Sequence, residues 1–288
     1  MQVYPIRRRA GGSDLRFGAL RRRSTTVTGV TIGTVIRSRL DTRSPEYQAN
    51  LAAMQELWDG VAAELASVPT IGGQRYVDRH RRRGKMWVRE RIEALVDPDT
   101  PFLELSPLAG WGTQDLVGVG SCTGIGIVEG VECAISGSDM TYRGGSGNPT
   151  TWKKGSRFHE IARENRLPVI VLNESAGADL PRQADLFIQG GASFKDLTQL
   201  SKMGIPSITM AFGPNTAGGA YTPGMSDYTV FVKERGTAYL GGPPLVKMEI
   251  DEIVDEENLG GAEMHSRTSG LSDYLAVDEL DAIRITRG

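Results

Sequence analysis

The spacing of the apolar residues changes near residue 116, from a helical period to short continuous runs. Ser44 followed by Pro45 is a typical helix start, and apolar residues then recur along one helical face. These residues are Leu51, Met54, Trp58, Val61 and Leu65. A second amphipathic stretch covers residues 87–96 and stops before a proline. The pattern predicts two helices ahead of residue 100.

A basic run at residues 80–85, HRRRGK, separates these two helices. One interpretation is a solvated turn. The other is a contact for an anionic ligand, such as the phosphates of a nucleotide-containing thioester. The run alone does not decide between them.

Residues 116–233 carry the pattern of an α/β domain. Apolar runs at 117–128 and 131–136 flank Glu129 and Gly130, which is typical of a β-hairpin. Continuous apolar runs follow at 168–173, 205–212 and 228–233. Glycines and a helical pattern follow the first two of these runs, and the first helical pattern continues through Leu186. Buried strands that alternate with helices indicate an α/β fold.

Composition excludes several classes of protein. The 288 residues, 39% hydrophobic and 24% charged, are enough for one large globular domain. No apolar run reaches about 18 residues, so we expect no membrane span and no membrane partner. Two cysteines and three unclustered histidines are too few for a disulfide scaffold or a four-cysteine zinc site. We therefore expect a reduced chain that holds no metal.

The first 43 residues differ from the rest in charge. They hold ten arginines and two aspartates, a net charge of +8, whereas the whole chain carries −2. We interpret residues 1–43 as a disordered basic extension and residues 44–288 as the folded domain. A transit peptide has a similar composition. We expect a cytoplasmic protein, or a mitochondrial one if the segment is a transit peptide. No aromatic stacking pattern accompanies the arginines, so we expect no nucleic-acid partner.

Three glycine-rich segments follow predicted strands within about 80 residues. They lie at residues 139–147 (DMTYRGGSG), 174–183 (ESAGADLPRQ) and 216–221 (TAGGAY). Small residues at a strand-to-helix junction expose backbone N–H groups near the positive end of a helix. Such groups bind a phosphate or an oxygen that becomes negative during a reaction. The alternative is that the glycines only permit tight turns and close packing.

Side-chain catalysts are not evident in the sequence. There is no GxxxxGK[ST] motif and no GxSxG motif, and Gly118, Gly120 and Gly124 are not spaced as a dinucleotide fingerprint. The carboxylates at 251–252 and 255–257 lie in a polar stretch typical of a surface loop. His265 is either an acid or base or a structural histidine. The sequence therefore offers backbone donors rather than a convincing side-chain catalyst.

Several motifs together resemble one family. They are FLEL at 102–105, TGIG at 123–126, NRLP at 165–168, ADLPRQAD at 178–185, TAGGAY at 216–221, LGGPPLVK at 240–247 and GGAEMH at 260–265. This set resembles the carboxyltransferase (beta) subunits of biotin-dependent acyl-CoA carboxylases, over residues 44–287. The LPRQAD form is similar to the methylcrotonyl-CoA carboxylase branch. Ala176 stands where that branch usually has glycine.

The resemblance implies a crotonase-like (ClpP/crotonase) fold of repeated ββα units. It also implies transfer of a carboxyl group from carboxybiotin, carried by a partner, to an acyl-CoA, with biotin as its own base. Backbone N–H groups would then hold the enolate oxygen, and we place these donors at Gly144, Gly145, Gly177 and Ala178. For the acyl-CoA or biotin pocket we select Arg143, Gly218, Gly219 and Ala220.

The resemblance covers only the amino-terminal half of such a subunit. It implies an acyl-CoA half-site that is inactive without the C-terminal half, which binds carboxybiotin. Expected partners are that half, a biotin carboxylase or biotin carrier subunit, and further copies in a homo- or hetero-oligomer. The alternatives are a crotonase-type acyl-CoA decarboxylase and a non-catalytic acyl-CoA-binding or assembly module.

Overall fold

The computed structural model describes residues 3–5, 38–70 and 72–288, and it divides into two units. One unit is Arg8–Ala63, and the other combines Met1–Arg7 with Glu64–Gly288. Residues 6–37 lie outside the described residues, so the disordered basic extension stays a prediction. Within the basic segment, Val3–Pro5 forms strand β1, which the sequence did not predict.

Helix α1 (Pro45–Ser67) confirms the first predicted helix, and most of it belongs to the smaller unit. Its start is capped as expected, because the Ser44 hydroxyl accepts a 3.1 Å hydrogen bond from the N–H of Tyr47. The regular apolar face is largely exposed, however, and Met54 and Trp58 keep 65% and 54% of their accessible surface. The periodicity therefore predicted the helix but not burial of its face.

The larger unit contains a mixed sheet. Among the described residues, nine strands form it in the order β1-β2-β3-β4-β5-β6-β7-β9, with β8 paired to β6. Neighbours from β1 to β4 are antiparallel, and the pairs from β4 onward are parallel. The strands after β1 are β2 (Pro101–Glu104), β3 (Ser121–Val128), β4 (Val131–Ser138), β5 (Val169–Ser175), β6 (Ser207–Thr216), β7 (Tyr228–Val232), β8 (Thr237–Tyr239) and β9 (Tyr274–Ala276).

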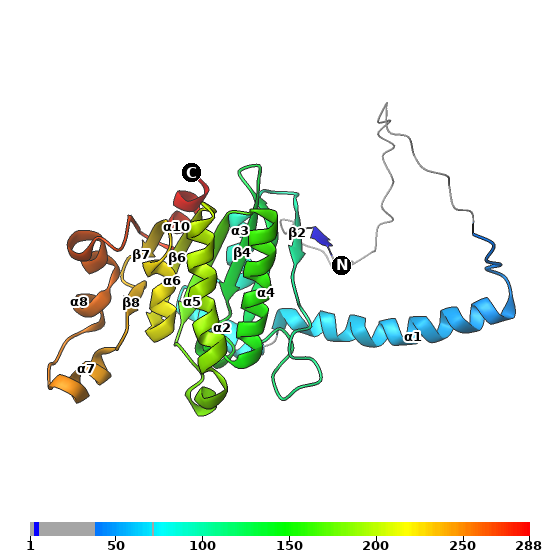
Figure 1. The fold of residues 1–288 in the computed structure, drawn as a ribbon, viewed down its shortest axis with the longest axis horizontal. Helices are drawn as coiled ribbons and strands as arrows, with labels where there is room; N and C mark the ends of the chain where they lie inside the picture. The colour runs from blue at the N-terminus through cyan, green and yellow to red at the C-terminus, as the bar shows by residue number, and fades with distance from the viewer. Residues whose placement is uncertain (1–2, 6–37, 71) are drawn as a thin grey trace. The chain divides into compact units, whose positions relative to one another are not determined.

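Helices cover both faces of this sheet (Figure 1). Helices α3 (Val88–Leu95) and α10 (Glu279–Arg287) pack on one face, where Ile135 of β4 joins a core with Ile92 and Ile283. Helices α4 (Pro149–Asn165) and α5 (Phe187–Lys202) pack on the other, where Ala134 meets Phe158. Neighbouring residues of one strand thus enter opposite cores, as the pleat of a strand requires. The predicted α/β class is confirmed.

Shorter elements connect these layers. The remaining helices are α2 (Gln74–Arg82), α6 (Tyr221–Gly224), α7 (Pro243–Ile250), α8 (Glu256–Gly260) and α9 (Ala262–Met264). Short 3-10 segments are η1 (Val68–Thr70), η2 (Arg143–Gly145), η3 (Leu180–Asp185) and η4 (Ala217–Ala220), and η5 (His265–Ser269) is a short π-helix. Strands β3 and β4 with α4 form one ββα unit.

Two predicted boundaries were wrong. Strand β3 begins at Ser121 rather than 117, because Gly118, Val119 and Gly120 have positive φ and cannot continue a strand. The helical pattern placed before Leu186 is the 3-10 turn η3, and the α-helix α5 begins only at Phe187. The hairpin between β3 and β4 is confirmed, with Glu129 and Gly130 both at positive φ in its turn.

The surroundings of both cysteines and of one histidine indicate structural roles rather than catalytic ones. Cys122 and Cys133 are buried and free, and burial raises the pKa of the Cys122 thiol to about 12. His265 has both ring nitrogens hydrogen-bonded, one to the Ser269 hydroxyl at 2.7 Å and one to the Ala238 carbonyl at 2.8 Å. Its buried ring therefore serves packing rather than acid-base chemistry.

Over residues 3–5, 38–70 and 72–288, the helices lack the combination of length and apolar character that a membrane span requires. In the same ranges, no three His, Cys, Asp or Glu side chains are grouped to hold a metal ion.

Candidate functional site

The three glycine-rich segments meet at one edge of the sheet. The N–H of Gly147 donates to the carbonyl of Gly177 at 2.9 Å, and the N–H of Ala176 donates to the carbonyl of Gly144 at 3.1 Å. These bonds join the first segment to the second. The Asn173 amide, one residue before the second segment, donates to the carbonyl of Gly219 in the third segment at 3.0 Å, and a Cβ atom on Gly219 would lie 3.2 Å from the Cβ of Ser175. The three segments follow β4, β5 and β6, and the carboxyl ends of these strands lie at one edge because the strands are parallel neighbours.

The first segment is a left-handed turn. Arg143, Gly144 and Gly145 have φ values of 47°, 64° and 67°. Glycine adopts this conformation freely, whereas for Arg143 it costs about 1–2 kcal/mol. A Cβ atom on Gly145 would lie 2.6 Å from the carbonyl oxygen of Glu174, so only glycine fits against the end of β5. Backbone strain at a turn of this kind is characteristic of functional sites.

Only some of the predicted backbone donors are available. The N–H of Gly145 donates to the Tyr142 carbonyl at 2.9 Å, and the N–H of Gly177 donates to the Ser175 hydroxyl at 3.1 Å. The N–H groups of Gly144 and Ala178 have no hydrogen-bond partner among the described residues. These two N–H groups, one from each segment, are therefore the ones that could bind an external oxygen.

A cavity of about 530 Å³ lies beside the first segment. One wall is a single face of α2 and its end, with Tyr76, Arg79, His80 and Arg83 at helical spacing. The remaining lining residues are Gly72, Lys85, Leu116, Met140, Thr141, Tyr142, Arg143, Gly144 and Glu174. The basic run is only partly a turn: its first three residues form the last turn of α2, and Arg83 and Gly84 form the turn that follows.

The cavity is strongly cationic. It is lined by Arg79, Arg83, Lys85 and Arg143, against a single carboxylate from Glu174. Lys85 pairs with Glu174 and Arg143 pairs with Asp179, whereas Arg79 and Arg83 form no ion pair with any described residue. Burial is the main cause that lowers the pKa of His80, although Glu174 acts in the opposite direction. The ring is therefore neutral at pH 7, and the surplus positive charge belongs to the arginines.

The structure separates the eight predicted site residues into three groups. Arg143 and Gly144 line the cavity. Gly145, Gly177 and Ala178 lie in the adjoining backbone but outside the lining. The other three, Gly218, Gly219 and Ala220, lie in η4, which contacts the second segment and not the cavity.

Sequence reasoning missed part of the wall. Tyr76 and Arg79 precede the basic run, and Leu116 lies in a loop between strands. The available signal was the spacing of Tyr76, Arg79 and Arg83 along one helical face. Nothing in the spacing of residues could place that face opposite residue 143.

The LPRQAD segment and the unusual alanine also have structural explanations. Arg182 donates a 2.7 Å hydrogen bond to Asp115, which also accepts one of 2.9 Å from Thr150. The motif thus anchors the chain after β5 to the loop before β3. Ala176 has a negative φ and its methyl group is exposed, so the extra carbon is accommodated without strain.

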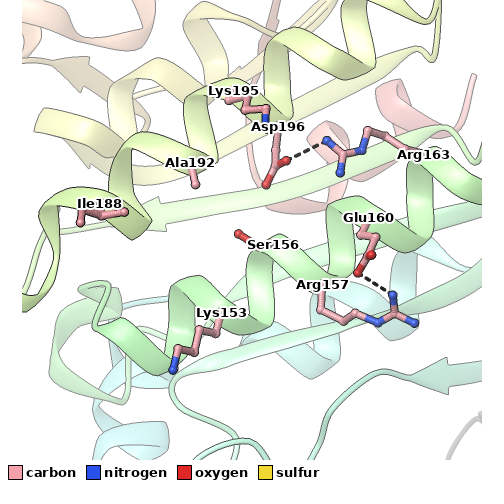
Figure 2. A pocket seen from close by; sticks show the side chains of 9 residues that line it. All are labelled: Lys153, Ser156, Arg157, Glu160, Arg163, Ile188, Ala192, Lys195 and Asp196. Atoms are coloured by element: carbon pink, nitrogen blue, oxygen red, sulfur yellow. Dashed lines mark hydrogen bonds and ion pairs between the residues drawn. The ribbon is translucent and has the colours of Figure 1, made fainter.

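A second groove, of about 470 Å³, lies between α4 and α5 (Figure 2). Arg157 pairs with Glu160 at 2.5 Å, and Arg163 pairs with Asp196 at 2.8 Å, so much of its charge is neutralised within the groove (Figure 2). None of the three glycine-rich segments lines it. The cavity beside Arg143 is therefore the stronger candidate site.

Comparisons with known proteins identify the family of the chain. A family model described as "Carboxyl transferase domain" matches residues 79–288. A probable biotin-dependent acyl-coenzyme A carboxylase beta2 subunit of Mycobacterium tuberculosis is 56% identical, over 88% of this chain and 48% of that protein. A mitochondrial methylcrotonoyl-CoA carboxylase beta chain of Dictyostelium discoideum is 46% identical, over 88% and 44%.

A solved structure supports the same relationship. The beta subunit of P. aeruginosa geranyl-CoA carboxylase superposes with a TM-score of 0.73 and 39% identity, over 88% of this chain and 48% of that one. The predicted crotonase-like carboxyltransferase fold is thereby confirmed. The chain spans about half the length of the curated relatives it matches.

Proposed function

Because the chain belongs to the carboxyl transferase family, we propose that it forms the acyl-CoA half of the carboxyltransferase site in a biotin-dependent acyl-CoA carboxylase. The observation that carries this proposal is the pair of unpartnered N–H groups, Gly144 and Ala178, beside a cationic cavity. Two backbone donors and a cationic cavity suit a thioester of CoA, which carries phosphates.

The unpaired arginines of the cavity indicate how an acyl-CoA would be oriented in it. CoA carries a pyrophosphate and a 3′-phosphate, and arginine binds phosphate through its planar fork of donors. Arg79 and Arg83, which form no ion pair with any described residue, are the groups we expect to hold the nucleotide end. The acyl end would then reach toward Gly144. This favours the anionic-ligand interpretation of residues 80–85.

The chemistry of this half-site requires no side-chain base. When the proton next to the thioester carbonyl is removed, negative charge moves to the carbonyl oxygen. Two backbone donors hold that oxygen, and each such donor typically lowers the barrier by about 3 kcal/mol. Their positions are set by the left-handed turn at Arg143 and by the segment after β5. Carboxybiotin, when bound, supplies the carboxyl group and the base.

Substrate and partners follow from the same proposal. The LPRQAD motif and the methylcrotonoyl-CoA carboxylase relative favour a short branched acyl-CoA such as 3-methylcrotonyl-CoA. The biotin half of the site would come from the C-terminal carboxyltransferase half, and the biotin from a biotin carboxylase or biotin carrier subunit. An oligomer is the natural state for a site built from two halves.

The test measures binding first and transfer second. Calorimetry with a panel of short acyl-CoAs should show binding by this chain alone. The double variant Arg79→Met with Arg83→Met should bind each acyl-CoA at least tenfold more weakly, while Arg157→Met on α4 should bind like wild type. With the C-terminal half and carboxybiotin added, label should move from carboxybiotin to the acyl-CoA.

The alternatives give different outcomes. Binding without transfer, even with every partner present, would indicate a non-catalytic acyl-CoA module. Release of CO2 from a carboxylated acyl-CoA without a biotin acceptor would indicate a decarboxylase. Absence of acyl-CoA binding would refute the site itself.

A further inference from the structure

A buried charge network lies directly behind the cavity. Glu174, 1% exposed, accepts hydrogen bonds from Lys85 and, at 3.0 Å, from Arg91. Arg91 is equally buried and binds Glu279 of α10 through two hydrogen bonds, of 2.8 and 2.9 Å. Four charged groups from α3, β5, α10 and the α2–α3 loop thus form one chain of contacts.

The surroundings make room for this network. Gly213 of β6 lies against Glu174, and a Cβ atom there would be 2.7 Å from the Glu174 Cγ. The guanidinium of Arg91 lies 4.3 Å above the ring of Phe212. Charges in a core are costly unless they are paired and hydrogen-bonded, and here both carboxylates are.

The same network holds the backbone on both sides of Lys85. The N–H of Met86 donates to Glu279 at 3.0 Å. Arg235 donates to the carbonyl of Gly84 at 2.8 Å and lies 3.5 Å from Glu279. Lys85 is therefore restrained at its side chain by Glu174 and at its flanking peptide groups by Glu279 and Arg235. An ammonium has three donors, and Glu174 engages one of them.

We infer that Glu174 is a positioning residue that holds the ammonium of Lys85 at the cavity, where it can bind a phosphate of CoA. Glu279 of α10 supports this position from behind. The inference rests on the proposed acyl-CoA function for the identity of the ligand. Lys85 is the contacting group, and its side chain keeps 17% exposure where it lines the cavity. Glu174 itself acts only through Lys85.

The phosphates of CoA make the positioning role of Glu174 testable. A short acyl-CoA and the matching acyl-pantetheine present the same thioester, but only the first carries phosphates. Glu174→Gln should weaken binding of the acyl-CoA about tenfold, the size of one lost charge-assisted hydrogen bond, and leave acyl-pantetheine binding unchanged. Glu279→Gln should give the same selective loss, smaller in size. Glu160→Gln, which breaks an exposed pair on α4, is the matched control and should change neither.

A double-mutant cycle with Lys85→Met separates positioning from a general structural role. In the Lys85→Met background, Glu174→Gln should cause no further loss of acyl-CoA binding. An equal loss for both thioesters, or a full loss in the Lys85→Met background, would overturn the inference. If either buried glutamine prevents folding, Lys85→Met alone decides, because it must weaken acyl-CoA binding and spare acyl-pantetheine. A wild-type chain that binds neither thioester would instead refute the proposed function.

Discussion

Gly145 and Glu174 contact each other through their backbones, so closely that a Cβ atom on Gly145 would lie 2.6 Å from the Glu174 carbonyl oxygen. This contact joins the left-handed turn η2 to the end of β5. The turn η2 holds the unpartnered N–H of Gly144, and the segment after β5 holds that of Ala178. The distance between these two proposed oxyanion donors therefore depends on position 145, which tolerates no side chain.

Gly145→Ala should damage both folding and the site. The new methyl group collides with the end of β5, and φ at this position is 67°, so we expect a loss of about 2–3 kcal/mol in the free energy of unfolding. Urea denaturation measures this loss. Gly155→Ala in α4 is the control, since an added Cβ there would meet no described atom within 4 Å beyond its chain neighbours and the backbone of its own helix. That variant should be up to about 1 kcal/mol more stable than wild type. Equal stabilities for the two variants would contradict the close contact.

Arg91→Met should be among the most damaging single changes in this domain. It leaves the carboxylates of Glu174 and Glu279 buried without their shared cation, and breaking a buried pair costs about 3–5 kcal/mol. Arg157→Met, which breaks an exposed pair on α4, should leave stability close to that of wild type, because solvent screens such a pair. Thermal and urea denaturation of both variants provide the comparison. A small effect at Arg91 would mean that water reaches the network.

Asn148→Ala should weaken the start of α4. The Asn148 side chain caps this helix by accepting 2.9 Å hydrogen bonds from the N–H groups of Thr150 and Thr151. Loss of such a cap costs about 1–2 kcal/mol. Asn148→Ser, which restores a capping oxygen, should recover part of the loss in urea denaturation. No recovery would indicate that the buried position, rather than the cap, determines the cost.

Stability should fall in mild acid, in part because of His159. Burial is the largest cause that lowers its pKa below the usual 6.5, with Arg163 acting in the same direction and Asp196 against it. Below about pH 6.5 the unfolded histidine binds a proton that the folded one does not, so the free energy of unfolding falls as the pH falls. His159→Gln should reduce the slope of the free energy of unfolding against pH by at most about 1.4 kcal/mol per pH unit. Above pH 7 the substitution should not change that slope. Urea titrations at pH 5.5, 6.5 and 7.5 measure it. An unchanged slope would assign the effect to other groups, His80 among them.

Local signals predicted the centre of the sheet and the first helix. The Ser44 cap, the hairpin at Glu129 and Gly130, and the strands β5, β6 and β7 are each determined by residues close in sequence, and the structure confirms them. The start of β3 was wrong because the apolar run includes Gly118 and Gly120, whose positive φ values end the strand conformation. Hydropathy alone does not contain that information.

The cavity wall could not be predicted in the same way. Helix α2 buries only Val77, so it has no apolar period that would reveal which face is turned inward. Its placement depends on contacts between distant residues, and Arg91 and Glu174, for example, are separated by 83 positions. The three glycine-rich segments were found because each shows a local pattern, and parallel pairing of β4, β5 and β6 then brings them together. The charges behind the site show no such pattern.

The two buried cysteines give the fold a chemical reporter. Cys122 and Cys133 lie on the neighbouring strands β3 and β4, and burial raises their pKa values to about 12 and about 11. At pH 7 fewer than about one Cys122 thiol in 10⁴ is therefore ionised, and thiol reagents attack the thiolate. Such a reagent can modify these thiols only after the two strands separate. The rate of modification therefore measures how often the sheet opens, not how exposed the native surface is.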